Sequence, residues 1–177
     1  MRIPLTKYGI RELVLFGIPC VTGIGLSLVL LPWIAPIPIF FLAFLFNFFR
    51  DPNRYTPQGA GLIIAPADGT VSHIVPVFED NYLKCDTTKI SIFMSVLNVH
   101  VNCVPVHGRV EFIKHTKGKF LDARDDECFS SNENNLMGLS IMGSSTKIAV
   151  KQIAGKIAKR IVCACKTGDV FEQGQRF

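Results

Sequence analysis

Dense clusters of positive charge are absent from this sequence of 177 residues, although its formal net charge is +5 at pH 7. The lysines and arginines are scattered along the chain. A nucleic-acid-binding surface needs them gathered in a stripe, so the sequence argues against nucleic acid as a partner. A modest and dispersed positive charge suits the anionic headgroups of a lipid surface better.

Regular spacing is absent from the six cysteines. Cys20 lies in an apolar stretch, and no pair of C-x-x-C motifs of the kind that holds zinc is present. Cys163 and Cys165 would share one face of a strand, but a lone C-x-C is only a weak indication of metal. We therefore predict six reduced thiols in a protein that faces the cytosol, without a disulfide framework and without a metal site.

Charged residues are also absent from residues 13–49. As one helix this stretch would be roughly 55 Å long, too long for one crossing of a ~30 Å hydrocarbon layer. Prolines on both sides of Trp33 interrupt it, and basic residues flank both ends, which favours both ends on the cytoplasmic side. The sequence has no small-x-small cleavage site, so it does not indicate a secretory signal peptide. The sequence predicts a membrane-associated helical hairpin that either spans or dips into the bilayer.

The sequence changes character after Arg54, so we expect residues 1–54 to be a membrane anchor and residues 55–177 a β-rich domain. Residues 117–135 are polar and lack periodicity, so we predict a long surface loop there. No internal repeat is evident. Many short strands with regular turns predict an all-β sandwich or barrel-like domain. The apolar runs that favour strands are 62–65, 70–77, 89–96, 99–106, 109–115, 136–142, 147–153 and 159–165.

Two residues stand out chemically. Asp68 lies in a Pro-Ala-Asp-Gly turn, where an aspartate ordinarily caps its own backbone. His100 alternates with valines, so a strand would place it on one face with Asn98 and Asn102. A buried aspartate beside such a histidine could orient it as a general base. The residues alone leave the function open, because this pair lacks a nucleophile.

A hydrolase that uses Cys103 with His100 is a weaker alternative. The two residues are three apart, so on a strand their side chains would face opposite sides of the sheet.

Five segments together resemble phosphatidylserine decarboxylases in their order and spacing. The likeness is closest to the short bacterial and archaeal branch of that family, and it covers the chain from end to end. The segments are FFRDPNR at 48–54, APADG at 65–69, NVHVN at 98–102, QIAG at 152–155 and GQRF at 174–177.

The resemblance implies a proenzyme that cuts itself at a Gly-Ser bond, after which the serine becomes a pyruvoyl group on a small (alpha) subunit. The pyruvoyl carbonyl forms a Schiff base with the substrate amine and takes up the electrons released with CO₂, which yields phosphatidylethanolamine. It implies that Asp68 and His100 act with the serine in self-cleavage, and that His100 also acts in decarboxylation. The implied partner is phosphatidylserine in the cell membrane, with the β-rich domain on the cytoplasmic side. A homo-oligomer is left open.

One part of the family pattern has no counterpart here. The family continues beyond the Gly-x-Arg-Phe segment to its Gly-Ser cleavage pair, whereas this sequence resembles the large (beta) subunit. We therefore expect the pyruvoyl-forming serine to be missing and the 177-residue chain to be inactive alone. Ser144 follows a glycine, but its surroundings are those of a hairpin turn, so we expect it to be a decoy. The alternative is a truncated, non-enzymatic β-domain remnant with a membrane anchor.

Overall fold

The computed structural model describes residues 5–57, 59 and 61–177, which form two compact units. The helical unit contains the chain up to residue 54 together with residues 96–101. The β unit contains residues 55–95 and 102–177. The short segment 96–101, which includes His100, therefore belongs to the helical unit although β-unit segments precede and follow it in the sequence.

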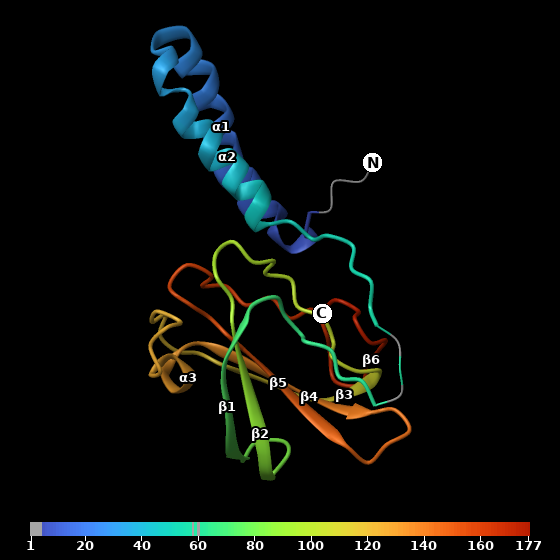
Figure 1. Ribbon diagram of the computed structural model, residues 1–177. Coiled ribbons are helices and arrows are strands. Elements are labelled where there is room, and N and C mark those ends of the chain that lie inside the picture. The colour runs from blue at the N-terminus through green and yellow to red at the C-terminus, as the bar shows by residue number, and fades with distance from the viewer. Residues whose placement is uncertain (1–4, 58, 60) are drawn as a thin grey trace. The chain divides into compact units, whose positions relative to one another are not determined.

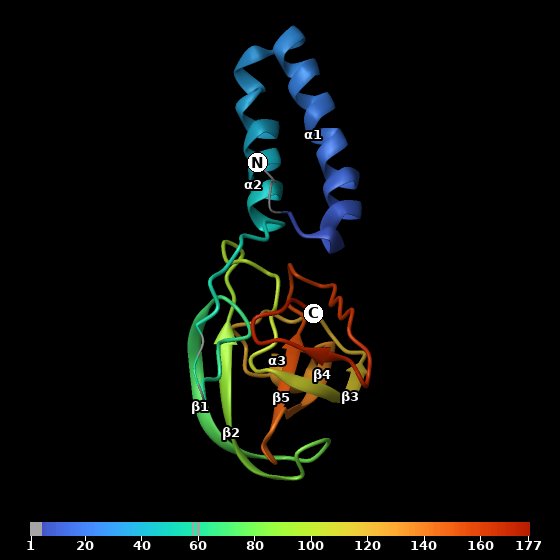
Figure 2. The same cartoon turned by 90° about the vertical axis from the view of Figure 1, so that its right-hand side faces the viewer.

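Two apolar helices run side by side in the helical unit (Figure 2). A 3₁₀ turn at Lys7–Gly9 leads into α1 (Ile10–Leu30), and a second turn at Pro32–Ile34 leads into α2 (Pro36–Phe48). Proline is tolerated at the start of α2 because the first N–H groups of a helix have no partner within it. Gly23 of α1 faces Pro38 of α2, and a Cβ at this glycine would make an ordinary contact with Cβ of Pro38 at 3.5 Å. The predicted helical hairpin is confirmed.

The β unit contains two antiparallel sheets (Figure 1). One is a ribbon of β1 (Thr70–Glu79) and β2 (Cys85–Phe93). The other is curled and has the order β5-β4-β3-β6. Its strands are β3 (Gly108–Thr116), β4 (Asn134–Ile141), β5 (Lys147–Ile153) and β6 (Val170–Phe171), and a short helix, α3 (Cys128–Ser131), precedes β4.

The core of the β unit lies where β3 and β4 meet the C-terminal segment. Apolar side chains on alternating positions of these strands are removed from water, and irregular segments supply the rest of the core. The buried residues of this cluster are Val104, Val106, Val110, Met137, Leu139, Cys165, Phe171 and Phe177.

The structure confirms most of the predicted strands and corrects three of them. The runs at 62–65, 99–106 and 159–165 are not strands, although they are apolar. Their backbones make single hydrogen bonds in place of a ladder: Ile64 N–H donates to the carbonyl oxygen of Pro105, and Val104 N–H donates to that of Gln175. Pro105 itself has no N–H to give. The β-rich part is thus two antiparallel sheets joined to irregular core segments.

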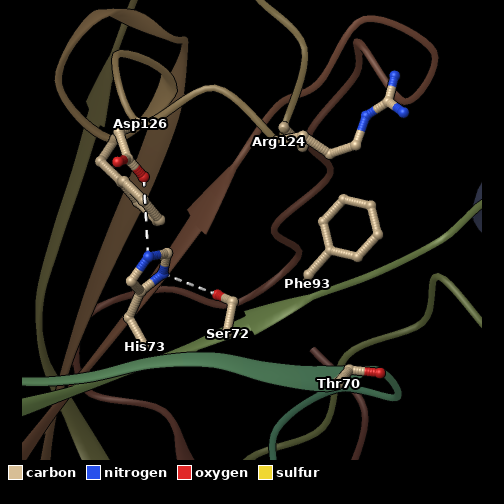
Figure 3. A pocket seen from close by; sticks show the side chains of 8 residues that line it. Thr70, Ser72, His73, Phe93, Arg124 and Asp126 are labelled. Atoms are coloured by element: carbon tan, nitrogen blue, oxygen red, sulfur yellow. Dashed lines mark hydrogen bonds and ion pairs between the residues drawn. The ribbon is translucent and has the colours of Figure 1, made fainter.

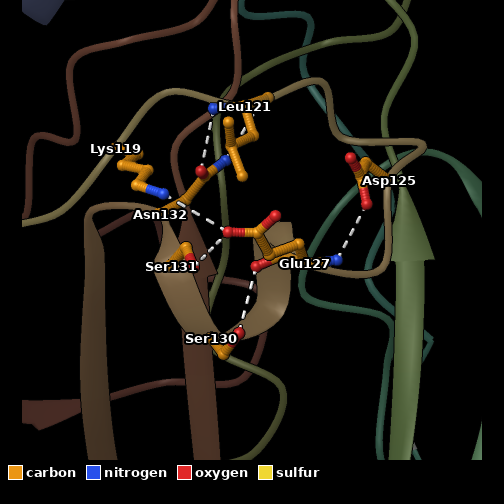
Figure 4. A network of polar contacts seen from close by, with 7 residues as sticks. All are labelled: Lys119, Leu121, Asp125, Glu127, Ser130, Ser131 and Asn132. Carbon is orange, nitrogen blue, oxygen red and sulfur yellow. Dashed lines mark hydrogen bonds and ion pairs between the residues drawn. The ribbon is translucent and has the colours of Figure 1, made fainter.

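The predicted loop at 117–135 is more ordered than its polar composition indicates, because it includes α3 and the first residues of β4. Asn132, only 1% exposed, holds it in place. Its side-chain oxygen accepts from Leu121 N–H at 2.8 Å, and its amide donates to the carbonyl oxygens of Leu121 at 3.1 Å and Ala154 at 2.8 Å. Figure 4 shows this network, in which Glu127 accepts from Ser131 and Lys119.

Candidate active site

His100 lies against the end of α2. Its imidazole stacks on the ring of Phe48, the last residue of the helix, with 4.5 Å between ring centroids and 30° between ring planes. Its Nδ1 is 2.9 Å from the carbonyl oxygen of Asn98. A carbonyl can only accept, so Nδ1 carries the hydrogen and Nε2 carries the lone pair. The ring is thus oriented as a proton acceptor at Nε2.

The surroundings of His100 favour its neutral form. Burial lowers its pKa below the ordinary value, because a charged imidazolium is poorly solvated there. The hydrogen bond to Asn98 opposes this effect, and the positive charge of Arg50 adds to it. The imidazole is therefore available as a base at neutral pH.

Arg50 joins the end of α2 to the segment that carries His100. Its Nη2 donates to the carbonyl oxygen of Leu97 at 2.7 Å, and its Nη1 donates to the carbonyl oxygen of Asn47 at 2.8 Å. Nη1 also contacts Oδ1 of Asn47. The last carbonyls of a helix lack partners and carry partial negative charge, so an arginine is well placed there. The sequence indicated Arg50 as a flanking charge and as part of the segment FFRDPNR, but its link to Leu97 could not be foreseen.

Asp68 lies in the β unit, half-buried in the bend that precedes β1. Gly69, which follows it, has φ +152°, and a Cβ at this position would lie 2.3 Å from the carbonyl oxygen of Phe93. Only glycine fits this close approach to β2. The predicted Asp-Gly turn is confirmed. Asp68 and His100 belong to different units, so their pairing stays a prediction.

The predicted polar face of Asn98, His100 and Asn102 is wrong, because residues 98–102 are not a strand. Asn98 contacts His100 through its backbone carbonyl. Asn102 belongs to the β unit, where its amide lies 3.4 Å from the carbonyl oxygen of Pro66 in the Asp68 turn.

A chain of side-chain amides extends from Asn102 into the curled sheet. Gln152 on β5 donates from Nε2 to Oδ1 of Asn102 at 2.8 Å. Asn135 on β4, 2% exposed, donates in turn to Oε1 of Gln152 at 3.3 Å. This amide chain ties the segment after His100 and the Asp68 turn to the sheet, and sequence analysis had singled out Gln152 only as part of a motif.

A second polar cluster lines a pocket of about 280 Å³ on the outer part of the β unit (Figure 3). A register shift between Val71 and His73 lets the consecutive side chains of Ser72 and His73 both line it. Nδ1 of His73 is 3.0 Å from Oγ of Ser72, and its Nε2 is 3.8 Å from Oδ1 of Asp126. The Asp126 side chain is 84% exposed, so this ion pair contributes little. Strand alternation in the sequence gave no sign of this cluster.

Within the described part of the chain, no three histidine, cysteine or acidic side chains gather in a way that could hold a metal ion.

Comparison with known proteins places these residues in a family. The family model described as phosphatidylserine decarboxylase matches residues 41–177, a span that includes Arg50, Asp68 and His100. The chain belongs to the phosphatidylserine decarboxylase family.

Three similar proteins are named phosphatidylserine decarboxylase proenzyme. The protein of Syntrophus aciditrophicus is 42% identical over 167 residues, which cover 91% of this chain and 78% of that protein. The protein of Geobacter sulfurreducens is 44% identical over 172 residues, with the same coverage of both chains. The protein of Carboxydothermus hydrogenoformans is 39% identical over 177 residues, or 99% of this chain and 80% of its own.

The one Gly-Ser pair in this decarboxylase-family chain, Gly143–Ser144, does not fit the pyruvoyl group of the family. It forms the turn between β4 and β5, where Oγ of Ser144 lies 3.0 Å from Oγ1 of Thr146 and accepts from Thr146 N–H at 3.1 Å. Cleavage there would separate two strands that pair along their length. The backbone of Cys103 contacts the Asp68 turn, since its N–H donates to the carbonyl oxygen of Pro66 at 2.9 Å.

Proposed function

We propose that this chain carries the acid–base residues of a phosphatidylserine decarboxylase, which converts phosphatidylserine into phosphatidylethanolamine and CO₂ at a membrane surface. The observation that carries the proposal is the family match over residues 41–177, which contains the oriented, neutral imidazole of His100. Identities of 39–44% over at least 91% of the chain support it.

In this proposal His100 is the catalytic base of decarboxylation, and Asp68 acts with His100 and the serine in self-cleavage of the proenzyme. Nδ1–H is held by the Asn98 carbonyl, which leaves Nε2 to accept and return a proton. Phe48 fixes the plane of the ring, and Arg50 fixes the segment that carries it. Arg50 and Phe48 act through His100 and are positioning residues.

The proposal also includes the family's pyruvoyl group, which supplies the carbonyl that takes up electrons from the substrate. We assign its serine to a position outside these 177 residues, on the small subunit. The hydrogen-bonded turn around Ser144 supports this assignment.

The helical hairpin would hold the site at the bilayer. Lys7–Leu30 is long and apolar enough to cross a membrane by length and composition, and α2 is a shorter apolar helix. We propose that the hairpin lies in the cell membrane and that the β unit faces the cytoplasm.

The decisive experiment is an intact mass of the natural protein purified from membranes, before and after treatment with a carbonyl-reactive hydrazide. A separate short chain that carries the hydrazide supports the proposal. A hydrazide adduct on a fragment that begins at position 144 would contradict the assignment of the serine. A single unmodified chain would contradict the enzyme proposal and favour the non-enzymatic remnant.

The role of His100 is tested with the variant His100→Ala of the natural two-subunit protein on vesicles that contain phosphatidylserine. The readout is CO₂ release per pyruvoyl group, with the pyruvoyl groups counted by the hydrazide. Loss of a general base should lower the rate by about 10²–10⁴-fold. His115→Ala is the matched control, because His115 is a half-exposed histidine on β3. Equal rates for both variants would remove His100 from the mechanism.

A further inference from the structure

Cys163 and Cys165 bring two sulfur atoms together in the β unit. Their Sγ atoms are 3.0 Å apart, although the segment that holds them is not a strand. Cys163 is half-buried, whereas Cys165 is 8% exposed and belongs to the core. Cys163 is therefore the more accessible of the two residues.

The two thiols differ in their affinity for a proton. A hydrogen bond from Cys165 lowers the pKa of Cys163 to about 6, burial opposes this, and a hydrogen bond from Asn135 adds to it. The pKa of Cys165 is raised by its hydrogen bond to Cys163, by burial and by the charge of its neighbour. At neutral pH the pair is one thiolate, at Cys163, and one thiol, at Cys165. Thiolates are the reactive form of cysteine.

The distance between the sulfurs favours sulfur chemistry over metal binding. Two thiolates that share a tetrahedral zinc ion at ~2.3 Å are about 3.8 Å apart. The observed 3.0 Å is shorter, and the third sulfur nearby, Sδ of Met137, is 3.5 Å from Sγ of Cys165.

We propose that Cys163 and Cys165 form a redox-active dithiol that reacts with low-molecular-weight disulfides such as glutathione disulfide. Cys163 is the attacking residue and Cys165 is the resolving residue. No step of this proposal depends on decarboxylase activity.

The reaction is a pair of thiol–disulfide exchanges. The Cys163 thiolate attacks one sulfur of the reagent, the reagent's S–S bond breaks, and one thiolate leaves. Cys165 then loses its proton to water and attacks Sγ of Cys163, which breaks the mixed disulfide and releases the second thiolate. The two cysteines lose two electrons and the reagent is reduced to two thiols.

The first exchange makes Cys165 easier to deprotonate, which favours the second exchange. In the mixed disulfide Cys163 carries no charge and no longer accepts a hydrogen bond as a thiolate. Two of the four causes that raise the pKa of Cys165 therefore disappear, and burial and the charge of Asp169 remain. The resulting disulfide closes a loop of three residues, and strained disulfides of this kind are readily reduced. The modification should thus be reversible.

Oxidation of the two cysteines would also change a contact of the amide chain formed by Asn135, Gln152 and Asn102. Asn135 donates both to Cys163 and to Gln152, and Gln152 donates to Asn102. A Cys163 that is bonded to Cys165 is a weak acceptor, so Asn135 loses a hydrogen bond to a charged partner.

The test exposes the reduced, full-length protein to glutathione disulfide at pH 7, then blocks remaining thiols with a maleimide and digests the protein for mass spectrometry. We expect the peptide with residues 163–165 to lose two hydrogen atoms, to exclude maleimide, and to regain both thiols with dithiothreitol. Maleimide on both cysteines after glutathione disulfide treatment would overturn the proposal.

The variants separate the two roles. Cys165→Ser should keep a stable glutathione adduct on Cys163, and Cys163→Ser should carry roughly tenfold less adduct on Cys165, because thiolate content and access both fall. Cys85→Ser, which removes an exposed cysteine from β2, should behave like the unaltered protein. Equal adduct on the two pair variants would overturn the assignment of roles.

The unaltered protein provides a readout that does not depend on variants that fold. At early quenching times, a glutathione adduct on Cys163 should precede the internal disulfide. A first adduct on Cys165, or an adduct on Cys163 that never resolves, would contradict the proposal.

Discussion

Single side chains set the protonation of His100. Burial against Phe48 and the nearby charge of Arg50 both disfavour the imidazolium, and the Asn98 carbonyl partly offsets them. The folded chain therefore holds this proton less tightly than the unfolded chain, whose histidine titrates near pH 6.5. Because the unfolded state then binds more protons, acidification through about pH 6.5 should lower the free energy of unfolding.

The first prediction concerns the variant Arg50→Gln. Its loss of charge should raise the pKa of His100 toward the ordinary value, because only burial then lowers it. An NMR titration of the His100 ring, with the protein in detergent micelles, should give a midpoint below about 6.5 for the unaltered chain and a higher one for the variant. Arg109→Gln, at an exposed position on β3, should leave the midpoint unchanged. A titration midpoint that is the same in both variants as in the unaltered chain would rule out the electrostatic role of Arg50.

The second prediction compares two glycines with positive φ. Gly69→Ala meets both the strain of φ +152° and the Phe93 carbonyl oxygen at 2.3 Å, whereas Gly143→Ala meets only the strain of φ +76°, with no atom within 4 Å. Strain alone costs about 1–2 kcal/mol. Gly69→Ala should therefore lower the free energy of unfolding in denaturant by more than Gly143→Ala does. Equal losses would show that β2 can move away from the turn.

At the scale of elements, one buried amide fastens a loop to a sheet. Asn132 satisfies the N–H and carbonyl of Leu121 in the loop (Figure 4). It also donates to the carbonyl of Ala154 after β5. Each of these backbone groups would lack a partner if the amide were replaced by an apolar group of similar size.

The third prediction follows from that arrangement. Asn132→Leu should lower the free energy of unfolding by about 3 kcal/mol or more, since three backbone groups lose their partner and each unsatisfied group costs about 1–3 kcal/mol. Ser130→Ala, at an exposed position in α3 two residues before Asn132, should change it by less than about 0.5 kcal/mol. Thermal unfolding followed by circular dichroism measures both. Similar effects of the two substitutions would mean that the loop is held by other contacts.

The elements that could be predicted are those whose sequence pattern has one structural solution. Residues 147–153 follow a Gly-Ser-Ser turn and pair with β4 as expected. Residues 99–106 were wrongly predicted to be a strand, because buried valines alternate in the same way whether a segment pairs in a sheet or lies singly against the core. The register shift at β1 lets the consecutive side chains of Ser72 and His73 line the same pocket. It leaves no pattern in the sequence.

Some features of the candidate site could likewise be predicted from the sequence and others could not. His100 and Asp68 were found through their local motifs, since a turn or a spaced histidine is visible in a few neighbouring residues. The contacts of Phe48 and Arg50 with residues 97–100 join segments about fifty positions apart, and they depend on where α2 ends. Single-sequence patterns carry no information on such distances.

At the scale of the whole molecule, the two ends of the hairpin meet. Leu5 and Arg50 form an antiparallel bridge, and Thr6 N–H donates to the carbonyl oxygen of Phe49 at 2.9 Å. α1 has 21 residues and is ~32 Å long, whereas α2 has 13 residues and is ~20 Å long. Only the first matches the ~30 Å hydrocarbon layer, yet the chain returns to its starting level. A hairpin in a bilayer would therefore enter and leave on the same side.

The fourth prediction is that an epitope tag at the N-terminus and one in the β4–β5 turn at Gly143 lie on the same side of the membrane. Backbone polar groups in the hydrocarbon layer need partners within the protein, and the turn between the helices supplies some, since Ile34 N–H donates to the carbonyl oxygen of Leu31 and Ala35 N–H to that of Pro32. Protease added to inverted membrane vesicles should remove both tags, and protease added to intact spheroplasts should remove neither. If each preparation loses a different tag, the chain crosses the membrane once, and the basic residues on both flanks do not decide its orientation.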